Sequence, residues 1–309
     1  MSMRYGIVIL PQDRWADGRR KWVEAEQLGF DHAFTYDHLS WRSLAGEPWG
    51  STIVTLTAAA VVTERIRLGT FVSSPNFRHP VPFAKDVASL DDVSGGRFTL
   101  GFGSGGTGFD AFVLGQQALS ARQRHERFAE FVELLDALLR FEAPDARAGE
   151  TRGADVEPPY GISFDGTWYT AHEARMVGRA AQQPRVPLVL AANGPKGLGL
   201  VAQFGQGWVT TGAEGATGEE WWRSVESLSG RLDDAAEAAG RDPGSIDRYL
   251  SVDSGGQYAL QSVGAFEEIV GRASGAGFTD VITHWPRADG IYAGSEDVLS
   301  EVASRFVRS

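Results

Sequence analysis

Residues 66–108 read IRLGTFVSSPNFRHPVPFAKDVASLDDVSGGRFTLGFGSGGTG, and this stretch decides the fold. Two apolar runs, 66–72 and 97–102, flank a segment, 81–93, whose apolar residues have helical spacing. A strand, a helix and a strand with short connections join parallel strands. Both runs end in small residues, and a backbone approaches a ligand closely only where side chains are small. The stretch therefore predicts a βαβ unit with parallel strands, and the ends of its two strands form half of a cofactor pocket.

The composition excludes several classes of protein. The 309 residues include 40 acidic and 29 basic side chains, for a formal charge of -11, and no cysteine. The acidic balance argues against nucleic-acid binding, and the lack of cysteine excludes disulfides and thiolate ligands. The N-terminal residues lack the pattern of a signal peptide, and no apolar run reaches the roughly 18 residues of a membrane span. We therefore expect a cytoplasmic protein that binds neither nucleic acid nor a membrane.

The rest of the chain repeats the pattern of a strand followed by a helix. Eight successive units of this kind predict an α/β fold, a (β/α)₈ TIM barrel in a single domain over residues 1–309. A doubly wound open sheet is the alternative, but it seldom needs eight consecutive units. The further strands are expected at residues 5–10, 31–36, 186–192, 207–211, 245–252 and 278–283, and the further helices at 16–28, 52–63, 121–141, 198–204, 219–239, 263–276 and 295–306.

One segment interrupts this order between the fourth helix and the fifth strand. Residues 142–183 are polar and rich in glycine and proline, and 162–170 can form a hairpin around Asp165-Gly166. A stretch of this length without a core pattern is usually functional. We interpret it as an insertion, or lid, outside the barrel.

The candidate catalytic residues follow the strands, because such barrels have their active site at the carboxyl ends of the strands. His38 follows the second strand, where its ring can carry a proton or donate a hydrogen bond, although it could also simply cap the strand end. Asp37 is placed to orient a group, and Trp41 to form an aromatic wall. His38, Asp37 and His284 lack the spacing of metal ligands, so no metal site is predicted.

A second set of residues suits a phosphate. The run Asn193-Gly194-Pro195-Lys196-Gly197 follows a strand and opens a helix. Backbone amides at a helix N-terminus bind phosphate, and Lys196 adds positive charge. An ordinary helix start explains Pro195 but not the extra glycine and lysine. The run therefore predicts a phosphate anchor.

Together these motifs resemble the bacterial luciferase-like superfamily. The resemblance rests on Asp37-His38 with Trp41, LGTFV at 68–72, FRHP at 77–80, GGR at 95–97 with LGFGSG at 100–105, and AANGP at 191–195. The motifs occur in the right order along nearly the whole chain. The sequence is similar in particular to the branch that uses the deazaflavin coenzyme F420, while the FMN-using monooxygenases share the barrel and several motifs.

The resemblance implies a homodimeric barrel with the coenzyme ring at the strand ends. It implies a cis peptide bond between Phe71 and Val72 that backs the ring, and it makes His38, Asp37 and Trp41 active-site residues. The coenzyme-binding residues that it implies are Phe71, Val72, Ser104, Gly105, Gly106, Ala191, Ala192, Asn193, Gly194 and Lys196.

One position departs from the family pattern. The sugar-phosphate dehydrogenases of this branch carry a glutamate proton donor where this chain has Gly106, and their basic sugar-phosphate ligands have no clear counterparts. Glucose 6-phosphate is therefore not the expected substrate. We predict an F420-dependent oxidoreductase that moves a hydride to an organic small molecule, reducing a C=C or C=N bond, with a proton from His38, Asp110, Tyr36 or water. The alternatives are an FMN-dependent monooxygenase and a non-catalytic flavin-binding relative.

Overall fold

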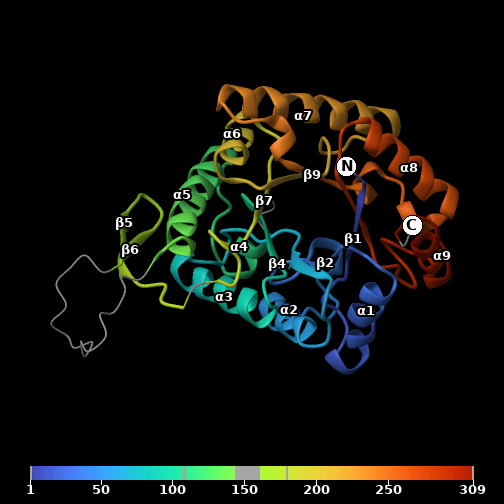
Figure 1. Ribbon diagram of the computed structural model, residues 1–309, viewed down its shortest axis with the longest axis horizontal. Coiled ribbons are helices and arrows are strands. Elements are labelled where there is room, and N and C mark those ends of the chain that lie inside the picture. The colour runs from blue at the N-terminus through green and yellow to red at the C-terminus, as the bar shows by residue number, and fades with distance from the viewer. Residues whose placement is uncertain (1, 107–108, 143–160, 179, 308–309) are drawn as a thin grey trace.

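Eight parallel strands close into a barrel within residues 2–106, 109–142, 161–178 and 180–307, which this computed structural model describes (Figure 1). Each strand pairs with its neighbours in chain order, and the last pairs with the first. The predicted (β/α)₈ TIM barrel is confirmed. The barrel strands are β1 (Arg4–Val8), β2 (His32–Thr35), β3 (Arg67–Thr70), β4 (Phe98–Gly103), β7 (Leu188–Ala191), β8 (Gly207–Thr210), β9 (Asp247–Ser251) and β10 (Asp280–His284).

The helices form a ring around these strands, as Figure 1 shows. A helix follows each barrel strand, so the chain winds around the barrel in one direction. This winding carries the end of every strand to the same face of the barrel. The outer helices are α1 (Trp15–Gln27), α2 (Thr52–Ala60), α3 (Pro80–Val93), α5 (Ala121–Leu139), α6 (Pro195–Phe204), α7 (Gly218–Ala238), α8 (Val263–Gly275) and α9 (Glu296–Val302).

The helix α5 illustrates how the sequence sets an end and a packing face. Ser120 and Gln123 form a capping box, in which Ser120 Oγ accepts from Gln123 N at 3.3 Å and Gln123 Oε1 accepts from Ser120 N at 3.0 Å. One stripe of the helix is apolar and packs against the strands. The residues predicted for this stripe, Phe128, Phe131, Leu135, Leu138 and Leu139, are all buried.

Two apolar layers hold the barrel together. The outer layer fills the space between strands and helices. The inner layer consists of Val8, Phe34, Tyr36, Phe71, Val189, Val209, Tyr249 and Ile282, most of them on the barrel strands. Tyr36 and Phe71 stand just beyond the ends of their strands. They therefore close the inner layer at the strand-end face of the barrel.

The predicted insertion contributes a hairpin beside α5 (Figure 1). Its strands β5 (Ile162–Asp165) and β6 (Thr170–Ala174) pair antiparallel, which confirms the expected hairpin. The backbone N–H of Thr167, in the loop of the hairpin, donates to the Glu130 carboxylate of α5 at 3.1 Å. Residues 143–160 and 179 of the insertion lie outside the described residues.

Some element boundaries differ from those expected. The helix α6 begins at Pro195 rather than at residue 198, because the fixed φ of proline suits the first helical position. Ser295 is the N-cap of α9 and accepts from Asp297 N at 3.0 Å, and a π turn, Ala303–Val307, ends that helix early. A short helix, α4 (Phe109–Val113), was not expected from the sequence.

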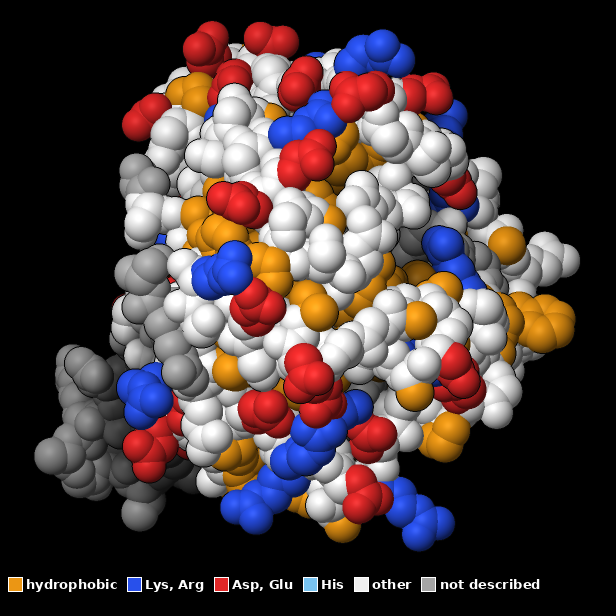
Figure 2. Space-filling model, turned by 90° about the vertical axis from the view of Figure 1, so that its right-hand side faces the viewer, with side chains coloured by type: hydrophobic (Ala, Val, Ile, Leu, Met, Phe, Trp, Pro, Cys, Tyr) orange, Lys and Arg blue, Asp and Glu red, His pale blue; other side chains and the backbone are white. Residues whose placement is uncertain are grey.

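Figure 2 shows the side of the barrel that carries α8, α9 and α1. Acidic and basic side chains lie next to one another across it. Arg20 of α1, for example, pairs with Glu24 at 3.0 Å and with Glu296 of α9 at 2.7 Å. Exposed pairs of this kind each contribute about 0–1 kcal/mol, so they add little to stability. In the described part of the chain, no helix combines the length and the apolar character needed to cross a membrane.

Candidate active site

The ends of β3 and β4 form the first wall of the site. The peptide bond between Phe71 and Val72 is cis, as the resemblance implies. The Phe71 ring is buried and packs on Phe34 with ring centroids 5.3 Å apart, whereas Val72 is partly exposed. Ser73 N then donates to Gly101 O at 2.8 Å, so the two strand ends stay joined beyond the cis bond.

His38 lies just beyond β2, and its side chain is 13% exposed. Its Nδ1 is 2.9 Å from Oδ2 of Asp110, whose side chain is fully buried. An ionised carboxylate only accepts hydrogen bonds, so Nδ1 carries the hydrogen. The described residues give Nε2 no partner, which leaves this nitrogen for a ligand.

Asp110, in α4, orients His38 and does not supply a proton itself. It also accepts from the backbone N of Leu39 at 2.9 Å and from Asn76 Nδ2 at 3.2 Å. Burial alone would raise the pKa of Asp110, but the hydrogen bonds that it accepts, chiefly from His38, hold the pKa below its ordinary value. The carboxylate is therefore ionised at neutral pH, which removes Asp110 from the four proton sources considered from the sequence.

Asp37 is adjacent to His38 in the chain, yet its carboxylate is bound elsewhere. Its two oxygens accept from Arg78 Nε and Nη2 at 3.1 and 2.6 Å, and the side chain is buried. A bidentate pair of this kind fixes the FRHP loop against the end of β2. The group that Asp37 orients is thus Arg78, whereas Asp110, 72 residues from His38 in the chain, orients the histidine.

Aromatic rings surround His38. The Trp41 ring lies 4.5 Å from the His38 ring, centroid to centroid, at an interplanar angle of 37°. The Tyr36 ring meets Trp41 edge-on at 5.0 Å. The predicted aromatic wall is thus present around Trp41, with Tyr36 as a second member.

A second histidine–carboxylate pair lies at the same face, and sequence reasoning did not join its members. Nδ1 of His284, the last residue of β10, is 2.7 Å from Asp253 Oδ2, and its Nε2 is 2.8 Å from the Tyr36 hydroxyl. The Tyr292 ring stacks on the His284 ring at 3.7 Å with an interplanar angle of 4°. The available signal was that Asp253 and His284 end neighbouring strands. Among the described residues, no cluster of three histidine or acidic side chains is placed to hold a metal ion.

The glycine-rich loop after β4 combines a tight turn with open space. Gly105 has a φ of 73°, and a Cβ at this position would lie 2.3 Å from Asn76 Oδ1, so only glycine fits. Around Gly106 nothing lies within 4 Å of a Cβ position. Ser104 is partly exposed between the strand and this space. Nearby, at the end of β3, the buried Ser73 Oγ has no partner in the described structure.

The end of β7 carries the next part of the site. Ala191 and Ala192 are partly exposed. The Asn193 side chain is used structurally, because its Nδ2 donates to Gly212 O and its Oδ1 accepts from Thr210 Oγ1, both at 2.8 Å. Asn193 therefore offers a ligand its backbone rather than its amide.

Positive charge gathers where α6 begins. Gly194 caps this helix, so the amides of its first turn point out of its end, with the exposed Lys196 beside them. On α5, Arg124 and Arg127 each have a buried Nε without a partner in the described structure. The hydrogen bonds that these arginines do make are to neutral oxygens, a backbone carbonyl at 2.8 Å and the Asn76 amide at 2.7 Å. An anionic ligand would satisfy them.

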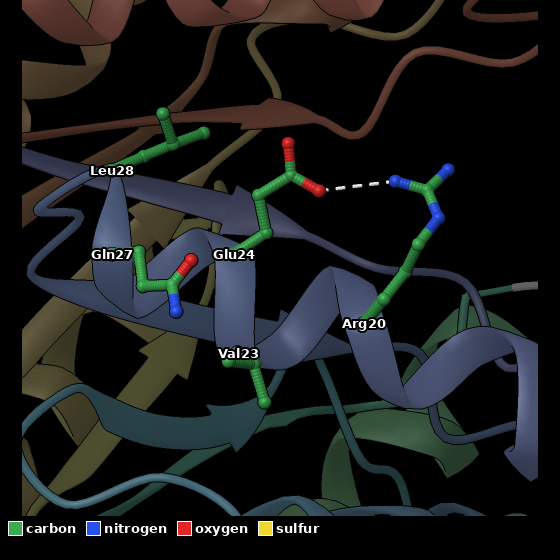
Figure 3. A pocket seen from close by; sticks show the side chains of 5 residues that line it. All are labelled: Arg20, Val23, Glu24, Gln27 and Leu28. Carbon is green, nitrogen blue, oxygen red and sulfur yellow. Dashed lines mark hydrogen bonds and ion pairs between the residues drawn. The ribbon is translucent and has the colours of Figure 1, made fainter.

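Two surface cavities lie away from these strand ends. One of about 350 Å³ lies on the outer face of α1 and is lined by Arg20, Val23, Glu24, Gln27 and Leu28, as Figure 3 shows. The other, of about 390 Å³, lies at the amino ends of the strands, around residues such as Arg4, His32 and Arg67. The amino-terminal face of such a barrel serves stability, so neither cavity is the candidate active site.

Comparison with known families agrees with this geometry. Residues 3–253 match the model of a family described as luciferase-like monooxygenase. The chain belongs to this family. The family match thus covers the barrel strands from β1 to β9, the loops that carry His38 and the cis bond, and the start of α6.

Named relatives include dehydrogenases and monooxygenases. An F420-dependent glucose-6-phosphate dehydrogenase of Beutenbergia cavernae is 37% identical over 200 residues, which cover 62% of this chain and 52% of the relative. A 4-hydroxyprotoasukamycin monooxygenase of Streptomyces nodosus subsp. asukaensis is 30% identical over 232 residues, 74% of this chain and 54% of the relative. The chain therefore spans about half the length of these curated relatives.

Solved structures share the whole fold. The coenzyme F420-dependent tetrahydromethanopterin reductase of Methanopyrus kandleri superimposes with a TM-score of 0.73 at 18% identity, covering 100% of this chain and 99% of that one. At this identity the likeness concerns the fold alone. The closed barrel of this chain therefore has the same fold as that enzyme.

Proposed function

We propose that this protein is an oxidoreductase that uses coenzyme F420 to reduce a C=C or C=N bond of an organic small molecule. The observation that carries the proposal is His38, a largely buried imidazole that the ionised Asp110 orients and whose Nε2 is left for a ligand. It stands at the strand ends, beside small residues that leave open space. The relative from Beutenbergia cavernae is named as an F420-dependent enzyme, and this supports the choice of coenzyme.

The residues present fit a flat ring with an anionic side chain. A Cβ at Gly106 or at Gly194 would meet nothing within 4 Å, so both loops border free space. The unpaired Nε atoms of Arg124 and Arg127 suit a phosphate next to Lys196. When bound in its reduced form, the coenzyme supplies the hydride. We assign its binding to Phe71, Val72, Ser104, Gly105, Gly106, Ala191, Ala192, Asn193, Gly194 and Lys196.

His38 acts on the substrate rather than on the fold. When its ring is protonated, Nε2 donates a hydrogen bond to an electron-rich substrate atom, while Asp110 balances the charge. Trp41 and Tyr36 form the apolar wall that excludes water. Asp37 acts only indirectly, because it fixes the loop of Arg78.

The proposed substrate is apolar and unsaturated rather than a sugar phosphate. The wall beside His38 consists of the rings of Trp41 and Tyr36. Gly106 stands where the sugar-phosphate dehydrogenases of this branch carry an acid. A hydrogen-bond donor beside an apolar wall suits an enone or a cyclic imine.

We also propose that the protein is a homodimer, as the family resemblance implies. Val54 and Val61, at α2, are 68% and 69% exposed, and Val93 of α3 is 45% exposed. Exposed apolar residues on neighbouring helices suit an interface between copies. Light scattering should give twice the 33.4 kDa of the chain. The cytoplasmic location likewise stays a prediction.

Titration with both cofactors tests the proposal. We expect calorimetry to give tighter binding of F420 than of FMN. Reduced F420 should then be oxidised by a panel that includes cyclohexenone and a cyclic imine, followed at the visible band of the oxidised coenzyme. Tight FMN binding without F420 binding would instead favour a monooxygenase, the function in the name of the Streptomyces relative. Binding without turnover of any panel compound would favour a non-catalytic relative.

A further inference from the structure

The proposed function does not use the pair of Asp253 and His284, although this pair lies at the same carboxyl face of the barrel as His38. Building on that function, we propose that Tyr36 donates the proton of the reduction and that His284 and Asp253 hold it in position. The Tyr36 hydroxyl is 2.8 Å from His284 Nε2, and His284 Nδ1 is 2.7 Å from Asp253 Oδ2. The three groups form one continuous hydrogen-bonded line from β9 through β10 to β2.

Asp253 is surrounded by hydrogen-bond donors. Its side chain is 1% exposed, and it accepts hydrogen bonds from the backbone N of Ala259 and of His284, both at 2.8 Å. Thr283 Oγ1 donates to it as well, at 3.0 Å. Carboxylate oxygens that accept all these hydrogen bonds leave the donor role to the imidazole, so His284 Nδ1 carries the hydrogen of their contact. Nε2 is then left to exchange a proton with the Tyr36 hydroxyl.

No lysine or arginine pairs with Asp253 in the described structure; its partners are neutral donors and His284. The imidazole is therefore the group that can balance this buried charge. His284 is itself 2% exposed and covered by the stacked Tyr292 ring. A proton held on the imidazole can leave the line only through the hydroxyl of Tyr36.

Tyr36 is the member of this line whose ring contacts the His38 ring. Its ring lies edge-on to both histidine rings, with centroids 6.2 Å from His38 and 5.6 Å from His284. Burial, with smaller effects from Tyr292 and Asp253, raises the pKa of Tyr36 well above its ordinary value, so the hydroxyl keeps its proton until a reaction takes it. Tyr292 Oη, 3.3 Å from Tyr36 Oη, completes the contacts of the hydroxyl.

The step balances without a further reactant. A carbon of the substrate double bond accepts the hydride with its electron pair from the reduced coenzyme, which is oxidised. The other atom of that bond takes the proton from Tyr36 Oη. Tyr36 regains a proton from His284 Nε2. After the product leaves, solvent at the strand ends restores the proton of the imidazole through the Tyr36 hydroxyl. His38 remains the hydrogen-bond partner that polarises the substrate, whereas His284 positions and reprotonates Tyr36.

Tyr36→Phe removes the donor and keeps the ring. We expect kcat for the best panel compound to fall roughly hundredfold or more, with KM and the F420 dissociation constant near the parental values. Tyr249→Phe is the matched control, because Tyr249 is buried in the same inner layer at the opposite end of the barrel. Near-parental kcat in Tyr36→Phe overturns the inference while F420 binding and turnover in the parent keep the proposed function. Absence of F420 binding in the parent overturns both.

Nuclear magnetic resonance of histidine-labelled protein without coenzyme gives a readout that does not depend on turnover. We expect His284 to show a hydrogen on Nδ1 at unusually low field, assigned by its loss in His284→Gln. In Asp253→Asn this resonance should move upfield, and kcat should fall with KM unchanged. A His284 ring that carries its only hydrogen on Nε2 and points it at Tyr36 contradicts the arrangement, because Asp253 then cannot accept from Nδ1.

Discussion

Histidine–carboxylate pairs lie at both ends of this barrel, and they differ in what balances the carboxylate. At the amino end, Asp280 is bound by His32 Nε2 at 2.9 Å and by two nitrogens of Arg4 at 2.7 and 2.6 Å. An arginine cannot give up its proton in a protein. The charge of Asp280 is therefore balanced permanently, and this pair can only hold strands together.

At the carboxyl end the carboxylates of the two histidine pairs, Asp110 and Asp253, have no arginine partner in the described structure. Asp110 is bound by His38 and by neutral donors, and Asp253 by His284 and neutral donors. There the imidazole is the one ionisable partner of each carboxylate among the described residues, and it holds the hydrogen of their contact on Nδ1. The comparison teaches that the same pair of side chains serves stability or chemistry according to its third partner.

Breaking the amino-end pair should produce the largest effect, and on stability alone. Asp280→Asn leaves Arg4 and His32 without their shared anion, which costs roughly 3–5 kcal/mol for a buried pair, toward the lower value because Arg4 is 34% exposed. The melting temperature should fall by on the order of ten degrees, measured by calorimetry. Turnover per folded molecule should stay parental. A large loss of kcat in a folded Asp280→Asn protein would erase the contrast between the two ends.

The same carboxylate should contribute to the acid sensitivity of the protein. Burial favours a higher pKa for Asp280, but the hydrogen bonds from Arg4 and His32 hold it below its ordinary value of 3.8. Its folded pKa is thus the lower one, so its contribution is present above pH 3.8 and is lost as the pH falls below that value. Unfolding followed between neutral pH and acid should show a shallower loss of stability in Asp280→Asn than in the parent.

Breaking a carboxyl-end pair should affect turnover instead. His38→Asn removes the group at Nε2 but keeps a polar side chain, so we expect the variant to melt within a few degrees of the parent, to bind F420 and to turn over about a hundredfold more slowly. His172→Asn, at an exposed histidine of β6, is the matched control. Near-parental turnover would remove His38 from the chemistry, and failure to fold would make it a packing residue like His32.

A charge reversal at the predicted phosphate anchor should have a smaller effect, and on coenzyme binding. Lys196→Glu reverses a charge at the start of α6, the helix end proposed to bind the phosphate of the coenzyme together with the free Nε atoms of Arg124 and Arg127, and should weaken F420 binding about tenfold. Lys85→Glu, at an exposed lysine of α3, is the control. An unchanged dissociation constant for F420 in Lys196→Glu would mean that the phosphate binds elsewhere on the carboxyl face.

The sequence predicted the barrel and most of its strand ends, because alternation of strands and helices is a local pattern. It predicted the cis bond, which the structure contains, but it named no partner for His38. The true partner, Asp110, lies 72 residues away in a short helix that has no strong local signal. Local patterns carry no information about such pairing.

The pairing of Asp253 with His284 could have been predicted from the order of the strands. Asp253 follows the seventh barrel strand and His284 ends the eighth, and adjacent parallel strands end side by side. Tyr36 follows the second strand, which lies two places further around the closed barrel. Placing these strand ends on a circle predicts that the three residues are neighbours, whereas their mutual orientation depends on side-chain packing that only the structure supplies.

Anaerobic stoichiometry tests the reduction most directly. The protein is mixed, in the strict absence of oxygen, with reduced F420 and the panel compound of highest turnover, and oxidised coenzyme and reduced product are both counted. We expect one product molecule for each coenzyme oxidised, at the rate seen in air. Oxidation of the coenzyme that requires oxygen, or that yields an oxygenated product, would contradict hydride transfer and identify a monooxygenase.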